Sequence, residues 1–200
     1  HGGGFEIRES SNINLSNWVV AFSGAETIRY NTLQRFIKRF SSLGFKEKSI
    51  CTCYGLAEIT VDMTGRNVSD VEGDINVVQS NADFLTSQCH SYEVSCDEYV
   101  SAGKVINDHK IEIVTPDSKE VMSNGHVGEI WCQGPSVAQG YWGNIAATKE
   151  TFHAYTTDGQ GPYLRTGDLG FVKDDELYIV GRLKDMIIIR GRNHAPQDIE

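Results

Sequence analysis

The sequence predicts an α/β protein in which a parallel αβ sheet layer is followed by a small antiparallel, β-barrel-like subdomain. Two patterns indicate this fold class. The first part of the chain alternates a short apolar run, a segment with helical periodicity and a second apolar run, which is typical of a parallel sheet. From Gly103 onward the chain reads as short strands separated by Gly, Asn and Asp, which is typical of an antiparallel sheet or a distorted barrel.

The first part of the chain is predicted to contain a strand, a helix and a second strand. The first strand covers residues 18–22, an apolar run that we expect to be buried. The helix has its apolar residues at helical spacing, namely Leu33, Phe36, Ile37, Phe40 and Leu43. Asn31 or Thr32 is expected to cap the start of this helix, and Gly44 to close its end in the left-handed conformation. The second strand is expected over residues 49–54.

The second part of the chain is predicted to be built mainly of short strands. These strands cover residues 110–114, 128–133, 163–165, 170–172 and 177–180. A short helix is expected between them, over residues 144–152. Residues 65–101 fit neither pattern and are rich in Ser, Asn and Asp, so we expect a long surface excursion there.

These elements divide the chain into three expected parts. Residues 1–102 form part of the αβ subdomain and carry the excursion as an insertion, and residues 103–183 form the β-barrel-like subdomain. Residues 184–200 are expected to begin a further domain, because Pro196 marks the first turn of a helix that has only just started.

Composition excludes several classes of function. The formal net charge is −9 and the 18 basic residues are scattered, so we expect no nucleic-acid partner. No window approaches the roughly eighteen consecutive apolar residues of a transmembrane helix, so we expect no integral membrane segment. The 5 cysteines show no paired metal-type spacing, and Cys51 and Cys53 share one face of a predicted strand. We therefore expect reduced thiols, core packing at these two positions and a cytoplasmic protein.

The segment YLRTGDLG, residues 163–170, carries an acidic side chain at the start of a predicted hairpin. A four-residue turn over residues 173–176 would pair Asp168 with Gly181, whereas a three-residue turn would pair it with Arg182. Either register brings a carboxylate and a guanidinium to one edge, where glycines leave the backbone open to a ligand. The alternative interpretation is a salt bridge at the rim of the protein, beside a tight turn.

Two further loops follow the predicted parallel strands. In YGLAE, residues 54–58, Tyr54 offers a flat face to a base and Glu58 offers a hard oxygen ligand suited to magnesium. GAE, residues 24–26, follows the preceding strand, and neighbouring parallel strands place their terminal loops side by side. We therefore expect two walls of one cleft. The alternative is a pair of ordinary turns, with Tyr54 packed in the core and the acidic residues exposed or at a helix start.

These segments resemble the adenylate-forming superfamily of acyl and aryl ligases. The resemblance rests on GAE, YGLAE, GEIWCQGPSVAQGYW (residues 128–142), YLRTGDL and the closing run GRLKDMIIIRGRNHAPQDIE. It implies part of the large domain of that superfamily, followed by a small mobile domain reached through a hinge at Lys184. It also implies ATP and Mg²⁺ as cofactors, with ATP or AMP bound by Gly24, Ala25, Glu26, Tyr54, Gly55, Leu56, Ala57, Asp168 and Arg182.

The resemblance also implies a role for individual residues. Asp168 holds the two ribose hydroxyls, Arg182 contacts ribose and phosphate, and Tyr54 flanks the adenine. Residues 24–26 line the adenine pocket, and Glu58 binds magnesium. The glycine-rich phosphate loop and the catalytic lysine of the superfamily are expected upstream and downstream of these residues, so no catalytic residue is expected within them.

Within the superfamily the chain most resembles the fatty acyl-AMP ligases. Ala57 stands where many relatives carry threonine, and RGRNHAPQDIE nearly repeats the closing segment of these ligases, with Ala195 in place of an expected tyrosine. Residues 65–101 resemble an insertion that hinders the use of coenzyme A, although a neutral loop insertion is the alternative. The implied partners are a fatty acid and the phosphopantetheine arm of an acyl carrier protein or polyketide synthase.

The sequence also allows other interpretations. A fatty acyl-CoA ligase differs from it only in the insertion and the closing motif, and a non-catalytic adenylate-binding module would keep the pocket without turnover. HGGG at residues 1–4 is typical of an esterase oxyanion hole, but the chain contains no G-x-S-x-G nucleophile elbow. The histidines show no mutual spacing for a metal site or a triad, and we expect most of them at the surface.

Overall fold

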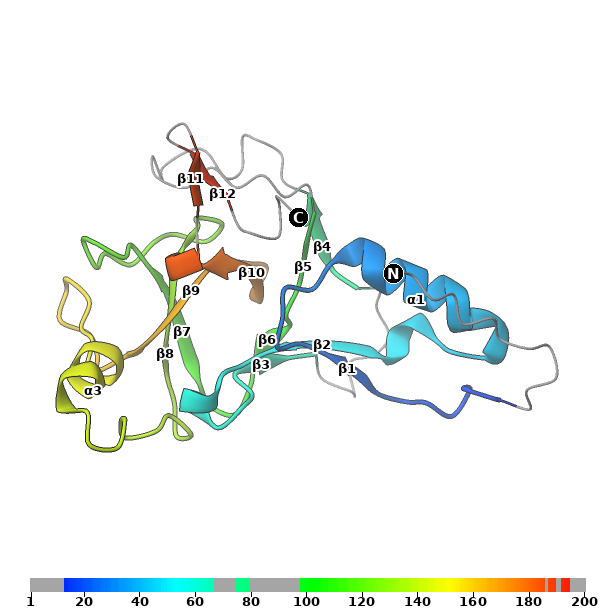
Figure 1. Ribbon diagram of the computed structural model, residues 1–200, viewed down its shortest axis with the longest axis horizontal. Coiled ribbons are helices and arrows are strands. Elements are labelled where there is room, and N and C mark those ends of the chain that lie inside the picture. Colours follow the sequence, from blue (N-terminus) through cyan, green and yellow to red (C-terminus); the bar gives the residue numbers. More distant parts are fainter. Residues whose placement is uncertain (1–12, 67–74, 80–97, 186, 190–191, 195–200) are drawn as a thin grey trace.

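The computed structural model describes residues 13–66, 75–79, 98–185, 187–189 and 192–194. Two four-stranded sheets organise these residues, with the strand order β1-β2-β3-β6 in the first and β10-β9-β8-β7 in the second. In Figure 1 the first sheet lies beside helix α1 (Tyr30–Phe40), and the second lies beside helix α3 (Ile145–Phe152). The predicted α/β fold class is therefore confirmed.

The first sheet contains the parallel pair. Its strands are β1 (Ala21–Ser23), β2 (Ile50–Tyr54), β3 (Thr64–Gly65) and β6 (Lys104–Val105). β1 runs parallel to β2, with Ala21 opposite Ile50, and the other pairs are antiparallel. Helix α1 and two short 3-10 segments, η1 (Ser41–Leu43) and η2 (Glu47–Ser49), connect β1 to β2. The strand, helix, strand pattern of the sequence thus forms the expected crossover.

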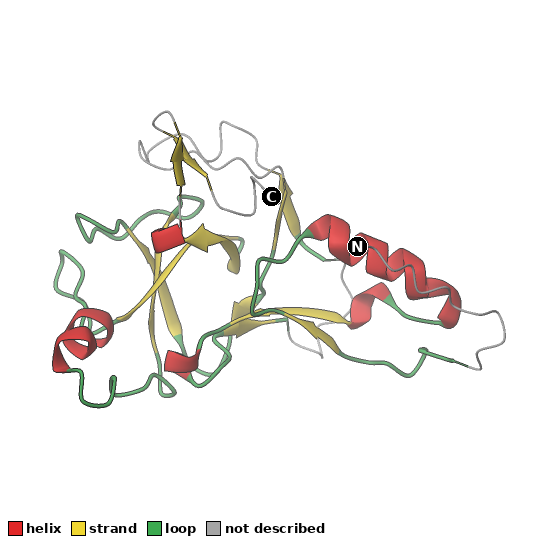
Figure 2. Ribbon diagram, in the orientation of Figure 1, coloured by secondary structure: helices red, strands yellow, loops and turns green. Residues whose placement is uncertain are grey.

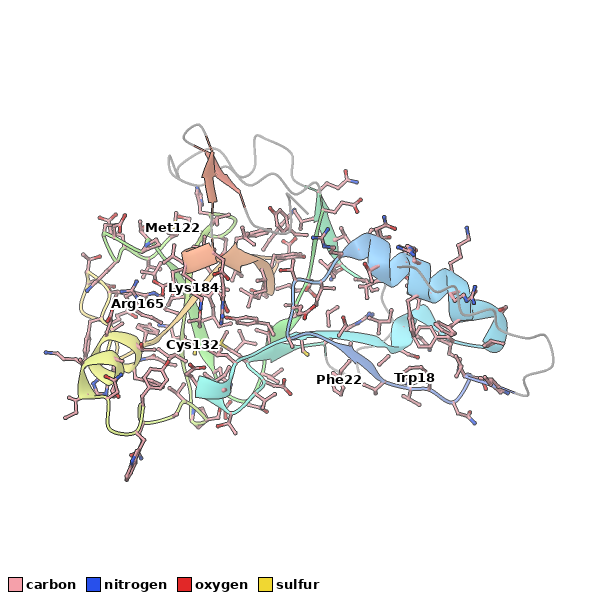
Figure 3. The ribbon with its side chains drawn as sticks, in the orientation of Figure 1. Trp18, Phe22, Met122, Cys132, Arg165 and Lys184 are labelled. Atoms are coloured by element: carbon pink, nitrogen blue, oxygen red, sulfur yellow. The ribbon has the colours of Figure 1, made fainter. Side chains whose placement is uncertain are left out.

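The prediction of a buried strand over residues 18–22 is wrong in both extent and burial. Strand β1 starts later, and the side chains of Val19 and Phe22 are 64% and 72% exposed. The physical reason is that β1 is an edge strand among the described residues, so that nothing described covers its outer side. Figure 3 shows Trp18 and Phe22 along this edge. Trp18 also packs edge-on against Phe45, at 5.4 Å between ring centroids.

Helix α1 starts at Tyr30, before both of the residues predicted to cap it. The expectation that Asn31 or Thr32 caps it is wrong, because the helix starts at Tyr30 and its N-terminal flanking residue makes no capping hydrogen bond. Tyr30 packs against the apolar cluster that contains Leu33, so this contact fixes the start of the helix. At the other end Gly44 adopts the left-handed conformation, with a φ of 89°, as predicted.

The second sheet is antiparallel and open among the described residues. Its strands are β7 (Lys110–Val114), β8 (Gly128–Gln133), β9 (Leu164–Lys173) and β10 (Glu176–Arg182). The strands predicted over residues 163–165 and 170–172 belong to one strand, β9, because Leu164 and Arg165 pair with β8 and the pairing with β10 starts at Asp168. Helix α3 confirms the predicted short helix, and the side chain of Asn144 caps it by accepting the Ala147 N–H at 3.1 Å.

Two apolar clusters hold this second sheet in place. One joins Ile130 and Leu164 of the sheet to Ile59 and Met63, which follow β2. The other gathers Leu169, Phe171 and Tyr178 from β9 and β10. The sheet therefore carries a large part of the described core, while a separate cluster around Leu33 lies beside α1; Figure 2 shows the strands of the sheet on the left of the view.

Part of the expected surface excursion is regular structure. β4 (Val77–Gln79) pairs antiparallel with β5 (Glu98–Val100), which corrects the expectation of no strand over residues 65–101. The pair forms because Val78 and Tyr99 are buried against the second sheet. Residues 67–74 and 80–97 lie outside the described residues, so the rest of the expected insertion stays a prediction.

The two sheets meet at residues 101–103. The Thr64 hydroxyl of β3 donates a 2.8 Å hydrogen bond to the carbonyl of Ala102, and the Ala102 N–H donates to the carbonyl of Leu177 at 2.7 Å. The Leu177 N–H in turn donates to the carbonyl of Gly103 at 3.0 Å. This short segment therefore ties β3 of the first sheet to β10 of the second.

The tryptophans lie in three different surroundings. Trp131 is fully buried in β8, Trp142 is fully exposed just before α3, and Trp18 is 41% exposed beside α1. Beyond β10 the chain continues through η5 (Leu183–Asp185) into a hairpin of β11 (Ile187–Ile189) and β12 (Arg192–His194). Among the described residues, no helix has both the length and the apolar character that crossing a membrane requires.

Candidate functional site

A cavity of about 750 Å³ opens where the two sheets meet. The loop after β1 contributes Ala25 and Glu26 to its wall, the end of β2 contributes Tyr54, Gly55 and Leu56, and the β9–β10 edge contributes Asp168 and Arg182. Four other predicted site residues are not on the wall, namely Gly24, Ala57, Glu58 and Lys184. The structure thus brings three segments that are distant in sequence to one place.

Close packing explains the glycines of the two loops. A Cβ at Gly24 would lie 2.7 Å from the sulfur of Cys53, so the loop after β1 approaches β2 only with glycine at this position. A Cβ at Gly55 would overlap the carbonyl of Val61, so the chain can turn sharply after Tyr54 only with glycine there. These close approaches place the GAE and YGLAE loops side by side, as parallel strands require.

The turn of the β9–β10 hairpin differs from both predicted turns. It contains only two residues, Asp174 and Asp175, both with positive φ, at 53° and 64°. Continued without interruption, this register would place Asp168 opposite Gly181. A bulge in β10 shifts the register, and Asp168 pairs with Arg182 instead. The meeting of carboxylate and guanidinium is therefore as predicted, but it is reached by a shorter turn and a bulge.

The carboxylate of Asp168 is held from two sides. Arg182 donates from Nε to Oδ1 at 2.9 Å, and the Tyr54 hydroxyl donates to Oδ2 at 2.6 Å. The hydrogen bond to Asp168 raises the pKa of Arg182. Burial, followed by the negative charge of Asp168, raises the pKa of Tyr54 well above its usual value. Both partners therefore keep their protons and remain donors to the carboxylate at neutral pH.

A buried ion pair supports the strand on which Asp168 lies. Glu129 of β8, only 1% exposed, accepts a hydrogen bond from Arg165 at 2.7 Å and another from the backbone N–H of Gly167 at 3.2 Å. The Thr166 hydroxyl donates to a β8 carbonyl at 2.7 Å and accepts from the Asp168 N–H at 3.1 Å. These contacts fix the backbone on both sides of Gly167, and Figure 3 labels Arg165 beside β9.

Glu58 lies in η3 (Ala57–Ile59), two positions after the cavity-lining Leu56. Its carboxylate accepts a hydrogen bond from the Tyr141 hydroxyl at 2.8 Å. Burial and this hydrogen bond raise the pKa of Tyr141, so its hydroxyl also stays protonated. Tyr141 was not among the predicted site residues, although it lies in the GEIWCQGPSVAQGYW segment.

A magnesium ion at this place would need a nucleotide to supply most of its ligands. Within the described part of the chain, no three or more His, Cys, Asp or Glu residues gather as a metal cluster would require. Magnesium is usually bound by one or two carboxylates together with substrate phosphates and waters. Glu58 matches this pattern as a single carboxylate ligand.

The contacts that fix η3 were not predictable from the sequence. The Ser136 hydroxyl donates to the carbonyl of Ile59 at 2.7 Å, and the Ala138 N–H donates to the carbonyl of Glu58 at 2.8 Å. Most histidines were expected at the surface, but His109 is only 8% exposed and bonds to the Ser136 hydroxyl at 2.7 Å. The resemblance drew attention to the segment over residues 128–142, but nothing in it indicated which side chains reach η3.

Lys184, the predicted hinge residue, lies exposed in η5, directly after the strand that carries Arg182 (Figure 3). The described cysteines are free thiols, as expected. Cys51 and Cys132 are buried, whereas Cys53 is half-buried and lines the cavity, so only the first of the two β2 cysteines is a core residue.

Comparison with known proteins defines the class of the protein. Residues 4–142 match the family of AMP-binding enzymes. The chain therefore belongs to this family of AMP-binding enzymes.

Individual relatives within this family include fatty-acid ligases. JamA of Moorena producens strain JHB, a medium-chain-fatty-acid–[acyl-carrier-protein] ligase, is 42% identical over 197 residues, which cover 96% of this chain and 33% of JamA. FadD21 of Mycobacterium tuberculosis H37Rv, whose name describes a fatty-acid–CoA ligase, is 40% identical over 194 residues, which cover 94% of this chain and 33% of FadD21. The chain spans about a third of the length of the curated relatives it matches.

A solved structure shows the same likeness. The crystal structure of a fatty acyl-adenylate ligase from L. pneumophila, in complex with acyl adenylate and pyrophosphate, is 36% identical and superposes with a TM-score of 0.75. The superposition covers 90% of this chain and 32% of that one. The predicted resemblance to fatty acyl-AMP ligases is therefore confirmed.

Proposed function

We propose that the protein activates a fatty acid with ATP, forming a fatty acyl-adenylate and releasing pyrophosphate. The observation that carries this proposal is the Asp168 carboxylate, which lines the cavity between Arg182 and Tyr54. A carboxylate presents two acceptor oxygens, so it can receive both hydroxyls of a ribose. The match to AMP-binding enzymes and the likeness to a fatty acyl-adenylate ligase support the same assignment.

The other predicted residues keep, in this proposal, the roles that the resemblance implies. Gly24, Ala25 and Glu26 form the loop on the adenine side of the cavity, with Ala25 and Glu26 on its wall, and the ring of Tyr54 flanks the base. Gly55 and Leu56 continue this wall and Ala57 follows them, while Lys184 serves as the hinge to the small domain. The division of the chain at residues 103 and 184 belongs to the same proposal.

The proposed reaction forms one bond and breaks another. An oxygen of the fatty carboxylate attacks the α-phosphorus of ATP, the bond from this phosphorus to the bridging oxygen breaks, and pyrophosphate leaves with the electron pair. The residues of the chain contribute by positioning, with Asp168 on the ribose, and by charge, with Arg182 near the phosphate. Glu58 would hold Mg²⁺ together with the nucleotide phosphates, and the ion would neutralise their charge.

The acceptor of the acyl group is proposed to be the phosphopantetheine arm of an acyl carrier protein or polyketide synthase. The name of JamA supports this acceptor, whereas the name of FadD21 favours the alternative, a fatty acyl-CoA ligase. A non-catalytic adenylate-binding module is the second alternative. We also propose a cytoplasmic location, because the odd number of cysteines, 5, favours reduced thiols.

The test is mass spectrometry of the products that the intact protein forms from ATP, Mg²⁺ and a medium-chain fatty acid. Coenzyme A and a phosphopantetheinylated acyl carrier protein are supplied together as competing acceptors. We expect acyl-AMP and acylated carrier protein, with little acyl-CoA. The matched control is the Asp168→Asn variant, which should form acyl-AMP at least about ten-fold more slowly, because it loses a charged acceptor.

Each other outcome contradicts a different part of the proposal. Abundant acyl-CoA would identify an acyl-CoA ligase and leave the expected insertion without a role in acceptor choice. Nucleotide binding without any acyl-AMP would identify a non-catalytic module. Equal rates for wild type and Asp168→Asn would remove Asp168 from the nucleotide site.

A further inference from the structure

The strongest unexplained contact in the cavity is the hydrogen bond from Tyr54 to Asp168. The two residues lie 114 positions apart in the sequence, and their oxygen atoms are 2.6 Å apart, the shorter of the two hydrogen bonds on this carboxylate. The role implied for Tyr54 concerns only its ring, which flanks the adenine. The hydroxyl is therefore not accounted for by that role.

The geometry of the carboxylate shows what this hydroxyl does. An ionised carboxylate has about four lone-pair positions, and Arg182 and Tyr54 each occupy one, on different oxygens. With both oxygens held, the carboxylate cannot rotate about the bond that joins it to Cβ. The remaining positions, one on each oxygen, are left for a ligand in the cavity that Asp168 lines.

The surroundings keep the Tyr54 hydroxyl in its donor form. Burial and the charge of Asp168 raise its pKa well above the usual value, and a contact with Thr166 opposes this only as a smaller effect. The side chain of Asp168 is only 11% exposed, so water competes poorly for the same lone pairs. Arg182 is 51% exposed, so its hold on Oδ1 is the looser of the two.

We propose that the Tyr54 hydroxyl is a positioning group that orients the Asp168 carboxylate for the two ribose hydroxyls, and so sets the preference for ribonucleotides over deoxyribonucleotides. This inference rests on the proposed function, because it takes Asp168 as the ribose acceptor. Tyr54 thus has two separable parts, a ring that faces the base and a hydroxyl that acts through Asp168.

The experiment compares the binding of AMP, 2′-deoxy-AMP and 3′-deoxy-AMP to the intact protein by isothermal titration calorimetry. For the wild type we expect AMP to bind about ten-fold or more tightly than either deoxy analogue, because each analogue leaves one lone pair of a buried carboxylate unfilled. Tyr54→Phe keeps the ring and removes the hydroxyl. In this variant the preference for AMP should fall by about three-fold or more, while binding of the deoxy analogues changes less.

Three further variants make the result specific. Tyr178→Phe is the matched control, because its hydroxyl also donates to a carboxylate, that of Glu176 at 3.4 Å, but it does not line this cavity. Its preference should equal that of the wild type. Asp168→Asn should lose most of the preference, and adding Tyr54→Phe to it should cause no further loss, because the hydroxyl acts through Asp168. Incorporation of 3-fluorotyrosine, which retains the hydroxyl, should retain the preference.

The outcomes separate the inference from the proposed function. An unchanged preference in Tyr54→Phe, together with a lost preference in Asp168→Asn, would overturn the inference and leave the proposed function intact. A preference unaffected by Asp168→Asn would overturn both. Additive losses in the double variant would show that Tyr54 acts on the nucleotide directly, and would also overturn the inference.

Discussion

Burial changes the chemistry of single side chains in this protein, and Cys132 is the clearest case. Its side chain lies in the fully buried part of β8, and burial raises the pKa of its thiol from 9.0 to about 12. A thiolate is the reactive form of cysteine, so this residue is chemically inert in the folded protein. Cys53, at the cavity, shares the direction of the shift but is only half-buried.

We predict that iodoacetamide leaves Cys132 unmodified at pH 8 in the folded protein. A pKa near 12 in place of 9.0 lowers the thiolate fraction by about a thousand-fold. Peptide mass spectrometry after a timed reaction checks this, with the protein in urea as the control in which Cys132 reacts fully. Equal labelling in both conditions would contradict the burial of this strand.

The same shift predicts a pH dependence. The unfolded chain ionises this thiol near its ordinary pKa of 9.0, whereas the folded chain keeps it protonated up to about 12. The contribution to stability is therefore complete below pH 9 and is lost as the pH rises toward 12. Urea unfolding of Cys132→Ala between pH 8 and 11 should show a weaker decline with pH than the wild type.

The sequence predicted which residue types form the candidate site, but it did not predict how these residues contact one another. A carboxylate, a guanidinium and an aromatic ring after a parallel strand could be read from Asp168, Arg182 and Tyr54. The hydroxyl contact between Tyr54 and Asp168 could not, because it joins two segments whose separation depends on the packing of both sheets. Tyr141 was missed for the same reason, since its partner Glu58 is distant in sequence.

At the scale of elements, the pairing of β8 with β9 depends on the buried ion pair between Glu129 and Arg165. The side chain of Glu129 is 2% exposed and that of Arg165 is 23% exposed. Removal of one partner of such a pair leaves the other charge without compensation in a place that water hardly reaches. The pair also holds the backbone next to Asp168.

We predict that Glu129→Gln lowers the free energy of unfolding by about 3 kcal/mol, because it leaves Arg165 uncompensated. Urea unfolding monitored by circular dichroism gives this value. Glu112→Gln on the neighbouring strand is the matched control, since its ion pair with Lys110 is more exposed and should contribute less than about 1 kcal/mol. Similar losses in both variants would show that burial of the Glu129 pair is without effect.

The β9–β10 turn is a second feature of this scale. Asp174 and Asp175 both have positive φ, which aspartate tolerates but asparagine and glycine favour in a two-residue hairpin turn. The double substitution Asp174→Asn with Asp175→Gly should therefore raise the free energy of unfolding by about 0.5–1 kcal/mol. AMP binding should not change, because the turn is at the opposite end of the hairpin from Asp168. A loss of stability would argue against this turn geometry.

Elements were predictable from sequence wherever local patterns decide them. The apolar spacing of α1, the asparagine cap of α3 and the strand residues of β7 and β8 are local signals, and each element formed. The start of α1 followed the packing of Tyr30 instead of a capping side chain. The hairpin register required a bulge in β10 that no residue there announces, and the exposure of Phe22 reflects the position of β1 at an edge of the sheet.

At the scale of the whole molecule, one buried hydroxyl joins the two sheets. Thr64 is completely buried, and its hydroxyl donates to the carbonyl of Ala102, which lies in the segment bound to β10. The cavity opens beside this junction and includes Ala102 in its wall. The relative position of the GAE and YGLAE loops and of Asp168 therefore depends on it.

We predict that Thr64→Val, which keeps the shape but removes the hydroxyl, lowers the free energy of unfolding by about 1–3 kcal/mol, because a buried carbonyl loses its partner. It should also weaken AMP binding. Thr157→Val is the matched control, since its hydroxyl donates to the carbonyl of Lys119 at 3.0 Å on the surface. Its change should stay within about 0.5 kcal/mol. A loss of stability in the control as large as that in Thr64→Val would contradict a special role for the junction.

The three tryptophans differ in burial, so their fluorescence can report on separate parts of the folded protein. In the described structure the guanidinium carbon of Arg165, on the strand of Asp168, lies 5.4 Å from the ring centroid of Trp131. Trp142 follows directly on Tyr141, the partner of Glu58, and Trp18 packs against Phe36 of α1. A buried indole emits at shorter wavelength than one in water, and only the latter is quenched by a solute such as acrylamide. Replacing two of the three by phenylalanine would thus give the strand next to Asp168, the segment next to Tyr141 or the crossover helix its own fluorescent reporter.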